Sequence, residues 1–368
     1  MLESKRRIVS LDVFRGFTVA SMIFVNIIAL TGETPYFLHH AEWEGIYFAD
    51  LVFPFFLFIG GISMAFAFAN EKNKTLKQRF NPFILRIILL FILGLFLNWI
   101  WSPANLNVRI PGVLQLIALS SLFASPFATT KPRWILSISI ILILIHSIVL
   151  LFVGAPGIQP GTFNSYGNIA GWIDMQIIGS NHMFNSTFDP EGILALISST
   201  ALLLIGLALG RTLQINVINT KLIFQFFITG ILISLIGFCL SFWIPVIKQL
   251  WTSSFILVLA GLGTLIFSSL YYYLDIKKIN SVLLVMLPLG RNALFIYVLS
   301  MLLTILIEGY AVFPSAGGSL IYLYDYIFSY NIPFLSPMCE QILSGLLFTI
   351  FHMLIAAFLH YKKIYIKL

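Results

Sequence analysis

The chain has 368 residues, of which 59% are hydrophobic and 10% are charged. Soluble domains contain about 45–50% apolar and about 25% charged residues. The mean hydropathy of +0.98 and the 35 phenylalanines therefore exclude a soluble globular protein, a disordered chain, a fibrous repeat and a disulfide scaffold. The composition predicts an all-α polytopic membrane protein, with the lipid bilayer as its main solvent.

Ten apolar runs are close to the length that an α-helix needs to cross the hydrocarbon core. Lys5, Arg6 and Arg7 precede the first run, as in a signal peptide, but Asp12 and Arg15 interrupt that run and it lacks a small-residue cleavage site. We therefore expect the first span to be retained. The ten predicted spans cover residues 11–31, 46–69, 82–101, 111–129, 134–153, 191–210, 221–241, 251–273, 282–306 and 340–360.

Most basic residues lie at the two termini or in alternate loops, whereas the opposite loops hold only Arg109 and Lys248. Positively charged loops stay on the cytoplasmic side, so both termini are predicted to be cytoplasmic. The net charge of +7 thus reflects topology, and no nucleic-acid partner is predicted. The basic residues assigned to the cytoplasm are Lys5, Arg6, Arg7, Lys72, Lys74, Lys77, Arg79, Lys131, Arg133, Arg211, Lys221, Lys277, Lys278, Lys362, Lys363 and Lys367.

Three long segments, at about 32–45, 154–190 and 307–339, connect spans on the external side and contain no Lys or Arg. Loops of this length are usually functional or disordered, and their aromatic and proline content favours folded caps. Because no internal repeat is evident, we expect a single domain over residues 1–368. The acidic residues in or beside these segments are Glu33, Glu42, Glu44, Asp174, Asp189, Glu308 and Asp325.

The densest group of ionisable residues lies at the external start of the second span. Imidazole exchanges protons near neutral pH, and a neighbouring carboxylate can orient it, which favours acid–base chemistry. Zinc also binds His and carboxylate, but the spacing matches no metal pattern and no metal is predicted. An aromatic interfacial loop with polar decoration is an equally open interpretation. The group comprises His39, His40, Glu42, Trp43, Glu44 and Asp50.

Further polar residues interrupt or flank the apolar spans, where charged groups are costly and functional by default. Asp12 and Arg15 are spaced to form an ion pair on one helix face. Asn26 is suited to a helix–helix hydrogen bond. Arg109 precedes a helix start at Pro111. It could pair with an external acid: Glu42, Asp189 or Glu191. Gln115 follows one turn into that span.

The ninth span contains Arg291 and Asn292 next to Pro288 and Gly290. This composition predicts an irregular helix that lines a polar cavity, and an arginine there suits a phosphate or carboxylate ligand. We interpret three histidines in other spans as packing or interfacial residues. These are His146, His352 and His360.

The ordered set of these motifs resembles the heparan-alpha-glucosaminide N-acetyltransferase family, within the transmembrane acyltransferases. The resemblance covers nearly the whole chain, and it is specific because the motifs occur together and in order. They are Ser10-Leu11-Asp12-Val13-Phe14-Arg15-Gly16, Phe24-Val25-Asn26, His40-Ala41-Glu42-Trp43-Glu44-Gly45, Ala49-Asp50-Leu51-Val52-Phe53-Pro54-Phe55, Arg109-Ile110-Pro111-Gly112-Val113-Leu114-Gln115, Asp189-Pro190-Glu191-Gly192-Ile193-Leu194, Leu250-Trp251-Thr252-Ser253 and Gly290-Arg291-Asn292-Ala293.

The resemblance implies acetyl-CoA as a cytoplasmic donor and the amine of a glucosamine-type sugar on the outer side as acceptor. The family's catalytic histidine corresponds to His40, and its active-site asparagine and acid correspond to Asn26 and Asp50. Arg15, Arg291 and Asn292 are expected to contact the donor. The expected acceptor-binding residues are Glu42, Trp43, Arg109, Gln115, Asp189 and Glu191.

Glu42, Glu44 and Leu116 depart from the family motifs, which have Ser, Asn and Arg at these positions. The departures keep the acyltransferase core and favour an acceptor other than heparan, such as glucosamine or a cell-wall amino sugar. We expect a bacterial relative in the cytoplasmic (inner) membrane, with a homodimer as one possible assembly. The alternative hypothesis is a transporter or flippase for a sugar or a lipid-linked glycan, which also needs a polar cavity.

Overall fold

The computed structural model describes residues 8–29, 34–69, 76–101, 107–279, 282–314, 320–323 and 335–366. Several residues used in the topology prediction lie outside this part of the chain. They are Lys5, Arg6, Arg7, Glu33, Lys72, Lys74, Asp325 and Lys367, together with the side chains of Lys77 and Arg79.

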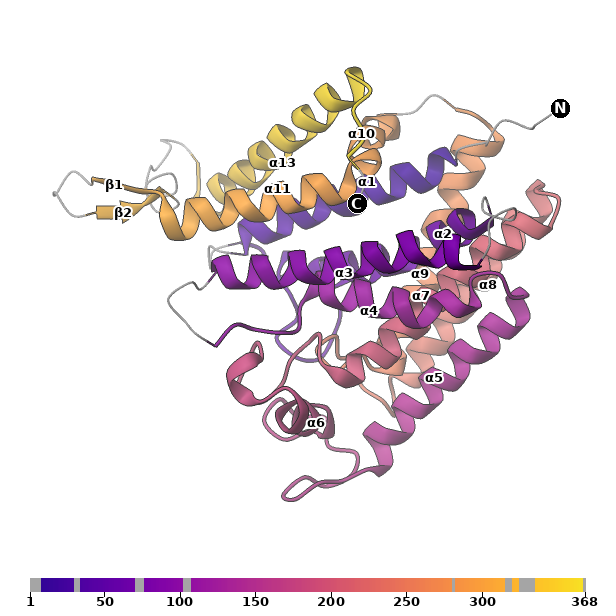
Figure 1. Cartoon of the computed structure of the whole chain (residues 1–368), viewed down its shortest axis with the longest axis horizontal. Helices are drawn as coiled ribbons and strands as arrows, with labels where there is room; N and C mark the ends of the chain where they lie inside the picture. Colours follow the sequence, from indigo (N-terminus) through magenta and orange to yellow (C-terminus); the bar gives the residue numbers. More distant parts are fainter. Residues whose placement is uncertain are drawn as a thin grey trace. The chain divides into compact units, whose positions relative to one another are not determined.

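The described chain forms two compact units, each built mainly from helices (Figure 1). Unit 1 comprises residues 1–40, 47–52 and 280–367. Its elements are α1 (Val9–Ile28), the 3₁₀ helix η1 (Tyr36–Leu38), the start of α2 (Phe48–Ala69), the 3₁₀ helix η5 (Val282–Met286), α10 (Leu287–Arg291), α11 (Ala293–Ile305), the π-helical turn η6 (Leu306–Tyr310), β1 (Val312–Pro314), β2 (Leu320–Tyr322) and α13 (Pro337–Tyr361).

Unit 2 comprises residues 41–46, 53–279 and 368. It contains most of α2 and the helices that follow. Two of these helices begin at an asparagine whose side chain accepts a backbone N–H group: Asn168 caps α6 (Ile169–Ile177), and Asn219 caps α8 (Thr220–Leu240). Its other elements are α3 (Leu76–Trp101), α4 (Val113–Ala124), η2 (Ser125–Phe127), α5 (Pro132–Phe152), α6 (Ile169–Ile177), η3 (Ser180–His182), α7 (Ile193–Ile215), α8 (Thr220–Leu240), α9 (Ser253–Leu270) and the π-helical turn η4 (Tyr271–Ile276).

Within the described residues, nine helices are long and apolar enough to cross a membrane. The prediction of an all-α polytopic membrane protein is therefore confirmed. The only described strands are β1 and β2, which pair antiparallel with Phe313 opposite Ile321.

Two predicted spans differ from the helices that form. Instead of one helix over 111–129, α4 covers 12 residues and continues into the 3₁₀ turn η2. At 1.5 Å per residue, α4 is shorter than the hydrocarbon core. The predicted span 282–306 is broken, since Asn292 adopts φ −119° and ψ 28° between α10 and α11. This break confirms the irregular helix expected from Pro288, Gly290 and Arg291.

Helix α7 is the most enclosed spanning helix of unit 2, with 78% of its apolar window buried, against 17% for α8. Glycines let α2 and α7 touch backbone to backbone, as is typical of membrane helix pairs. A Cβ atom on Gly61 would lie 2.0 Å from the carbonyl oxygen of Leu203, and one on Gly206 would lie 2.1 Å from that of Phe58. No side chain fits at either position without moving the helices apart.

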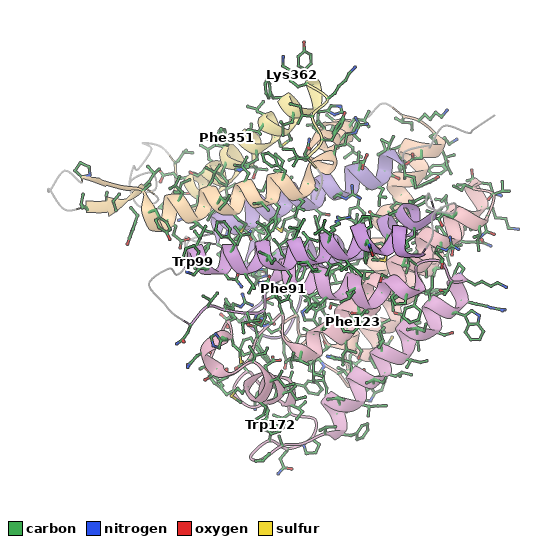
Figure 2. All side chains as sticks on the ribbon, in the orientation of Figure 1. Phe91, Trp99, Phe123, Trp172, Phe351 and Lys362 are labelled. Atoms are coloured by element: carbon green, nitrogen blue, oxygen red, sulfur yellow. The ribbon has the colours of Figure 1, made fainter. Side chains whose placement is uncertain are left out.

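Large apolar side chains cover the outward faces of the less enclosed helices (Figure 2). Trp99 on α3 and Phe123 on α4 are about half exposed, as is Phe351 on α13 in unit 1. In water such a surface would be an aggregation hazard, whereas hydrocarbon solvates it. Exposed apolar faces of this kind are what a membrane-spanning bundle presents to lipid.

The segment 154–190, which the topology prediction places on the external side, is folded. It contains α6 and η3, and residues Ile169 and Ala170 of α6 join a buried apolar cluster with Leu194 and Leu250. Trp43 packs against the same cluster. This segment therefore belongs to the core of unit 2.

Substitution of Gly61 by alanine is expected to destabilise the protein, because the new methyl group would lie within 3 Å of the α7 backbone. Gly60→Ala is a matched control on the same helix, since nothing lies within 4 Å of its added Cβ. Both changes gain about 1 kcal/mol of helix propensity. Thermal unfolding in detergent should give a midpoint several degrees lower for Gly61→Ala than for Gly60→Ala, and equal midpoints would contradict the close packing of α2 and α7.

Candidate functional site

His40 and Asp50 form a hydrogen-bonded pair in unit 1. Nδ1–H of His40 donates to Oδ1 of Asp50 at 2.7 Å. The Asp50 side chain is fully buried, whereas that of His40 is 47% exposed. Asp50 lies in the first turn of α2, where the helix dipole favours a negative charge, and its Oδ2 accepts the backbone N–H of Tyr47 at 3.0 Å. The Asp50 carboxylate is thus held by two hydrogen bonds. It keeps the imidazole of His40 in one tautomer, with the lone pair on Nε2.

The neighbouring histidine has a different environment. His39 bonds through Nε2 to the hydroxyl and the carbonyl oxygen of Thr34. Among the described residues, only one of the two adjacent histidines therefore contacts a carboxylate, and it is His40. Such a pair can take up a proton and stabilise the resulting imidazolium, which is the arrangement of an oriented general base.

Asn26 is a half-buried residue of α1 in unit 1. Its side-chain amide donates to Sδ of Met301 at 3.7 Å, so it links α1 to α11. This contact is the helix–helix hydrogen bond that the sequence indicated, with a thioether as a weak acceptor.

Arg109 is held by two carboxylates in unit 2. Its Nε and Nη2 donate to the two oxygens of Asp189 at 3.0 and 2.7 Å, and Nη2 also bonds to Glu191. The ring of Phe184 lies 4.9 Å from the guanidinium carbon, in cation–π geometry. The predicted pairing of Arg109 with Asp189 and Glu191 is therefore present, and it is bidentate to Asp189.

The electrostatics of this cluster follow from its burial. Burial opposes the charge on Arg109, but Glu191 and Asp189 outweigh it, so the pKa of Arg109 is raised above its ordinary value. Burial also raises the pKa of Glu191, and this effect exceeds the opposing effect of Arg109. Asp189 is the carboxylate with the bidentate contact, and it accepts two backbone N–H groups as well, from Phe184 and from Glu191. The cluster therefore combines a bidentate Arg109–Asp189 pair with a buried carboxyl group, Glu191, whose pKa lies above its ordinary value.

Asp174 is a buried acid whose structural role the sequence did not indicate. It lies in α6, is 2% exposed, and accepts the backbone N–H of Ile193 at 2.8 Å and that of Asp189 at 3.4 Å. A Cβ at Gly192 would lie 2.1 Å from its Oδ2, so the carboxyl group occupies the space left by that glycine. Burial raises the pKa of Asp174 to about 7. An aspartate that is the one charged residue of the run 169–177 was the available sequence signal.

Two amide side chains hold the segment that carries Arg109. Nδ2 of Asn98 donates to the carbonyl oxygens of Arg109 and Pro111, both at 2.8 Å. Gln115 is 3% exposed and donates to the carbonyl oxygen of Ile110 at 3.1 Å. Gln115 therefore shapes this segment through its backbone. Asn98, in α3, was not singled out in the sequence.

Glu42 and Trp43 lie in the short part of the His-Ala-Glu-Trp motif that belongs to unit 2. Nε1–H of Trp43 donates to the carbonyl oxygen of Phe163 at 2.6 Å, and its ring meets that of Phe188 edge to face. The backbone carbonyl of Glu42 accepts a bond from Gln249 at 3.4 Å. Trp43 thus anchors the segment 154–190 in unit 2.

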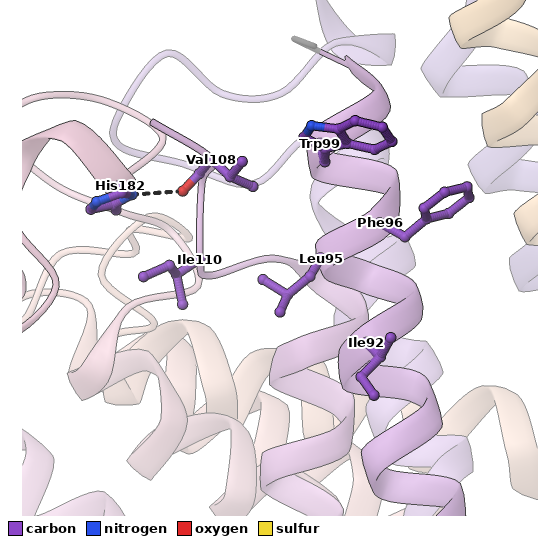
Figure 3. Close-up of a pocket in the computed structure, with 7 residues that line it drawn as sticks. All are labelled: Ile92, Leu95, Phe96, Trp99, Val108, Ile110 and His182. Carbon is purple, nitrogen blue, oxygen red and sulfur yellow. Dashed lines mark hydrogen bonds between the residues drawn. The ribbon is translucent and has the colours of Figure 1, made fainter. Parts of the chain in front are cut away.

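A surface pocket of about 490 Å³ lies between α3 and the segment around Arg109 (Figure 3). Its lining is apolar apart from His182, whose Nδ1–H donates to the carbonyl oxygen of Val108 at 2.8 Å. Arg109 does not belong to the lining, although its two neighbours do. The lining residues are Ile92, Leu95, Phe96, Trp99, Val108, Ile110 and His182.

Arg15 and Arg291 converge on Asp12 in unit 1. Arg15 donates to Asp12 at 3.2 Å and to the carbonyl oxygen of Gly290 at 3.2 Å, and Nε of Arg291 lies 3.8 Å from Oδ2 of Asp12. Two glycines make this possible: a Cβ on Gly16 would lie 1.9 Å from the Met286 oxygen, and one on Gly290 would lie 1.7 Å from the Asp12 oxygen. The glycine of each arginine motif therefore brings α1 and α10 into backbone contact.

Among the residues that the structure describes, no group of three or more His, Cys, Asp or Glu side chains is arranged to hold a metal ion. The ionisable residues gather instead in the pairs and clusters above. In each unit the polar groups lie within or beside apolar spanning helices. The fold defines a multi-pass membrane protein, and the His40–Asp50 pair has the geometry that an oriented general base requires.

Comparison with known proteins gives the family. The profile of the family described as heparan-alpha-glucosaminide N-acetyltransferase, catalytic, matches residues 7–244. The chain belongs to this family of acyltransferases, and the predicted family is confirmed. The match includes Asn26, His40 and Asp50 and ends before Arg291.

Two mammalian relatives are similar over most of this chain. The heparan-alpha-glucosaminide N-acetyltransferase of Homo sapiens is 28% identical over 79% of this chain and 52% of the relative. That of Mus musculus is 27% identical over 80% of this chain and 53% of the relative. The chain thus spans about half the length of the curated relatives it matches.

The raised pKa of Asp174 predicts a pH-dependent stability. The folded state keeps a proton on Asp174 up to about pH 7, whereas an unfolded aspartate releases it near pH 4. The free energy of unfolding therefore falls as the pH rises from about 4 to about 7. Asp174→Asn should remove this loss of unfolding free energy. Between pH 5 and pH 8 the unfolding midpoint of the variant should therefore rise relative to that of the wild type, by about 2–4 °C for each kcal/mol that the wild type loses. A constant difference in midpoint over this range would contradict the assignment.

Proposed function

We propose that this chain transfers an acetyl group from cytoplasmic acetyl-CoA to the amine of a glucosamine-type sugar on the outer side of the membrane. The observation that carries the proposal is the His40–Asp50 pair, at 2.7 Å, within the segment matched by the acyltransferase family. A transporter needs no such oriented base, so the pair favours an enzyme over the transporter hypothesis.

Two chemical routes suit an imidazole whose Nδ1 is bonded to a carboxylate. In the first, Nε2 of His40 takes a proton from the sugar amine while the nitrogen attacks the thioester carbonyl, and the carbon–sulfur bond then breaks to release the CoA thiolate. In the second, Nε2 itself attacks the thioester carbonyl, the carbon–sulfur bond breaks to release the CoA thiolate, and Nε2 carries the acetyl group. The sugar amine then attacks this acetyl group, the carbon–nitrogen bond to His40 breaks, and the freed Nε2 takes up the proton that the amine loses. In both, Asp50 stabilises the positive charge that develops on the ring.

The remaining site residues are assigned to the two substrates. Asn26 donates a hydrogen bond to the carbonyl oxygen of the thioester as charge develops there. Arg15, Arg291 and Asn292 serve the donor at the predicted cytoplasmic end of unit 1. Acceptor recognition falls to the external polar residues of unit 2, with Trp43 and Gln115 holding the loops in place. These acceptor residues are Glu42, Trp43, Arg109, Gln115, Asp189 and Glu191.

The proposed setting is a bacterial cytoplasmic (inner) membrane, with an amino sugar or another glycan as the acceptor. Glu42 and Glu44 add negative charge beside His40 in the sequence, which suits an acceptor that arrives as an ammonium ion. The proposal also includes two expectations from the sequence: residues 1–368 act as a single domain, and the protein assembles as a homodimer.

Loss of the imidazole at position 40 should abolish most of the transfer. Purified protein is given acetyl-CoA labelled in its acetyl group and glucosamine as trial acceptor, and the label on the sugar is measured. His40→Ala is expected to lower the rate by at least about 100-fold, the usual contribution of a positioned acid–base group. His39→Ala is the matched control and should retain near wild-type activity, because His39 bonds to Thr34. Full activity in His40→Ala would overturn the assignment.

The two routes differ in one exchange reaction. If His40 carries the acetyl group, the enzyme exchanges label between free CoA and acetyl-CoA without any acceptor. If His40 acts only as a base, this exchange requires the sugar. Asp50→Asn should slow either route, because the neutral amide no longer stabilises the imidazolium.

A further inference from the structure

The chain returns after α13 and docks its tail, Lys362–Ile366, against the break between α10 and α11 (Figure 1). Nδ2–H of Asn292 donates to the carbonyl oxygen of Ile364 at 3.2 Å, and Oδ1 of Asn292 accepts the N–H of Ile366 at 2.9 Å. Ile364 and Ile366 are two positions apart, and a neighbouring β-strand would form the same two hydrogen bonds with an extended segment. The side-chain amide of Asn292 therefore binds the tail backbone as a strand would, and it fixes the tail in place.

Asn292 can bind the tail backbone because it is buried at the break between α10 and α11. It is 1% exposed, and its own backbone leaves the helical conformation between Arg291 and Ala293. A buried amide with unmet donors and acceptors is costly, and the tail backbone meets one donor and one acceptor. The position of the tail is thus set by a buried polar residue of a spanning segment, 72 residues away along the chain from Ile364.

The docked tail places two further side chains beside Arg291. Nη1 of Arg291 lies 3.2 Å from Nδ1 of His360 and 3.3 Å from Oη of Tyr365. Oη of Tyr365 lies 3.2 Å from Nδ1 of His360, and the guanidinium carbon lies 5.8 Å from the Tyr365 ring centre. His360, which the sequence analysis treated as an interfacial residue, is therefore part of a polar cluster.

This cluster continues to Arg15 through Asp12, where the backbones of α1 and α10 touch at Gly16 and Gly290. Two guanidinium groups, a phenol and an imidazole thus gather at one end of unit 1, and Lys362 and Lys363 follow directly in the chain. Phosphate oxygens accept hydrogen bonds from all these groups, and arginine is the preferred partner.

We infer that Tyr365 and His360 complete a binding site for the phosphate-bearing nucleotide part of the thioester donor, and that Asn292 positions the tail that carries Tyr365. The inference rests on the proposed function for the identity of the donor. It changes the role assigned to Asn292: its amide holds Ile364 and Ile366, and Arg15, Arg291, His360 and Tyr365 contact the ligand. Asn292 is thus a positioning residue.

The test compares two donors on the full-length protein. Acetyl-CoA carries the nucleotide, and S-acetylpantetheine presents the same thioester without it. In Tyr365→Phe the KM for acetyl-CoA should rise about tenfold, the effect of losing one hydrogen bond to a charged group. The KM for S-acetylpantetheine and for the acceptor should not change. A variant that ends at Lys363 should show a larger effect with the same donor dependence.

Tyr361→Phe is the matched control, since Tyr361 ends α13 and its side chain is mostly exposed. It should behave like the wild type with both donors. An equal loss with both donors in Tyr365→Phe would indicate a merely structural tail and overturn the inference. Unchanged kinetics with both donors would overturn it as well.

Hydrogen exchange separates this inference from the proposed function. CoA without its acetyl group should slow amide exchange at Ile366, because a nucleotide on Tyr365 and Arg291 holds the tail against Asn292. If CoA slows amide exchange at Ile366 and no acceptor is acetylated, the nucleotide site is supported and the proposed acetyl transfer is contradicted. If acetyl transfer proceeds and CoA leaves exchange at Ile366 unchanged, the proposed function is supported and the inference about the tail is contradicted.

Discussion

A fully buried carboxylate at the start of a membrane-spanning helix is the constraint on which the candidate active site depends. Asp50 has no exposed surface, and a charge there is unfavourable unless fixed dipoles and a partner compensate it. The first turn of α2, the Tyr47 N–H and the imidazole of His40 supply that compensation. The same contacts set the tautomer of His40, so the burial of Asp50 is also what gives the histidine a defined chemical role.

Glycine contacts position the other polar groups in each unit. In unit 1, Gly16 and Gly290 let α1 and α10 meet at their backbones, so the arginines that precede and follow them in sequence share Asp12. In unit 2, Gly192 leaves room for the Asp174 carboxyl group, which in turn holds the turn that carries Asp189. Small residues act here by admitting a polar group or a backbone where any side chain would exclude it.

The arginines of the two units differ in the kind of partner they have. Arg109 is bound by two carboxylates and a phenylalanine ring, which makes its cluster a stiff support for the external loops. Arg291 contacts a phenol and an imidazole, and its nearest carboxylate oxygen in the described contacts is 3.8 Å away. One carboxylate at 3.8 Å offsets the charge of Arg291 less than two carboxylates in direct contact offset that of Arg109, which is why the proposed nucleotide site is placed at Arg291.

The sequence by itself determined the membrane class, most of the spans and the family, because apolar runs of this length and an ordered set of motifs are local properties of the chain. It also predicted the helix break at Asn292 from Pro288 and Gly290, and the pairing of Arg109 with external acids. It overestimated the span 111–129, where η2 interrupts the α-helical hydrogen bonding.

Tertiary structure decided which of the candidate polar groups meet. The sequence left three acids open as partners of Arg109, and the fold brings Asp189, 80 residues away, into bidentate contact with it. The contact between Arg291 and Tyr365, 74 residues apart, had no signal in the sequence. Asp174 and Asn98 are single polar residues whose partners are backbone groups, which a sequence pattern cannot show. Pairing depends on how segments approach in space, and that approach is set by packing between helices, whereas composition fixes only which segments enter the membrane.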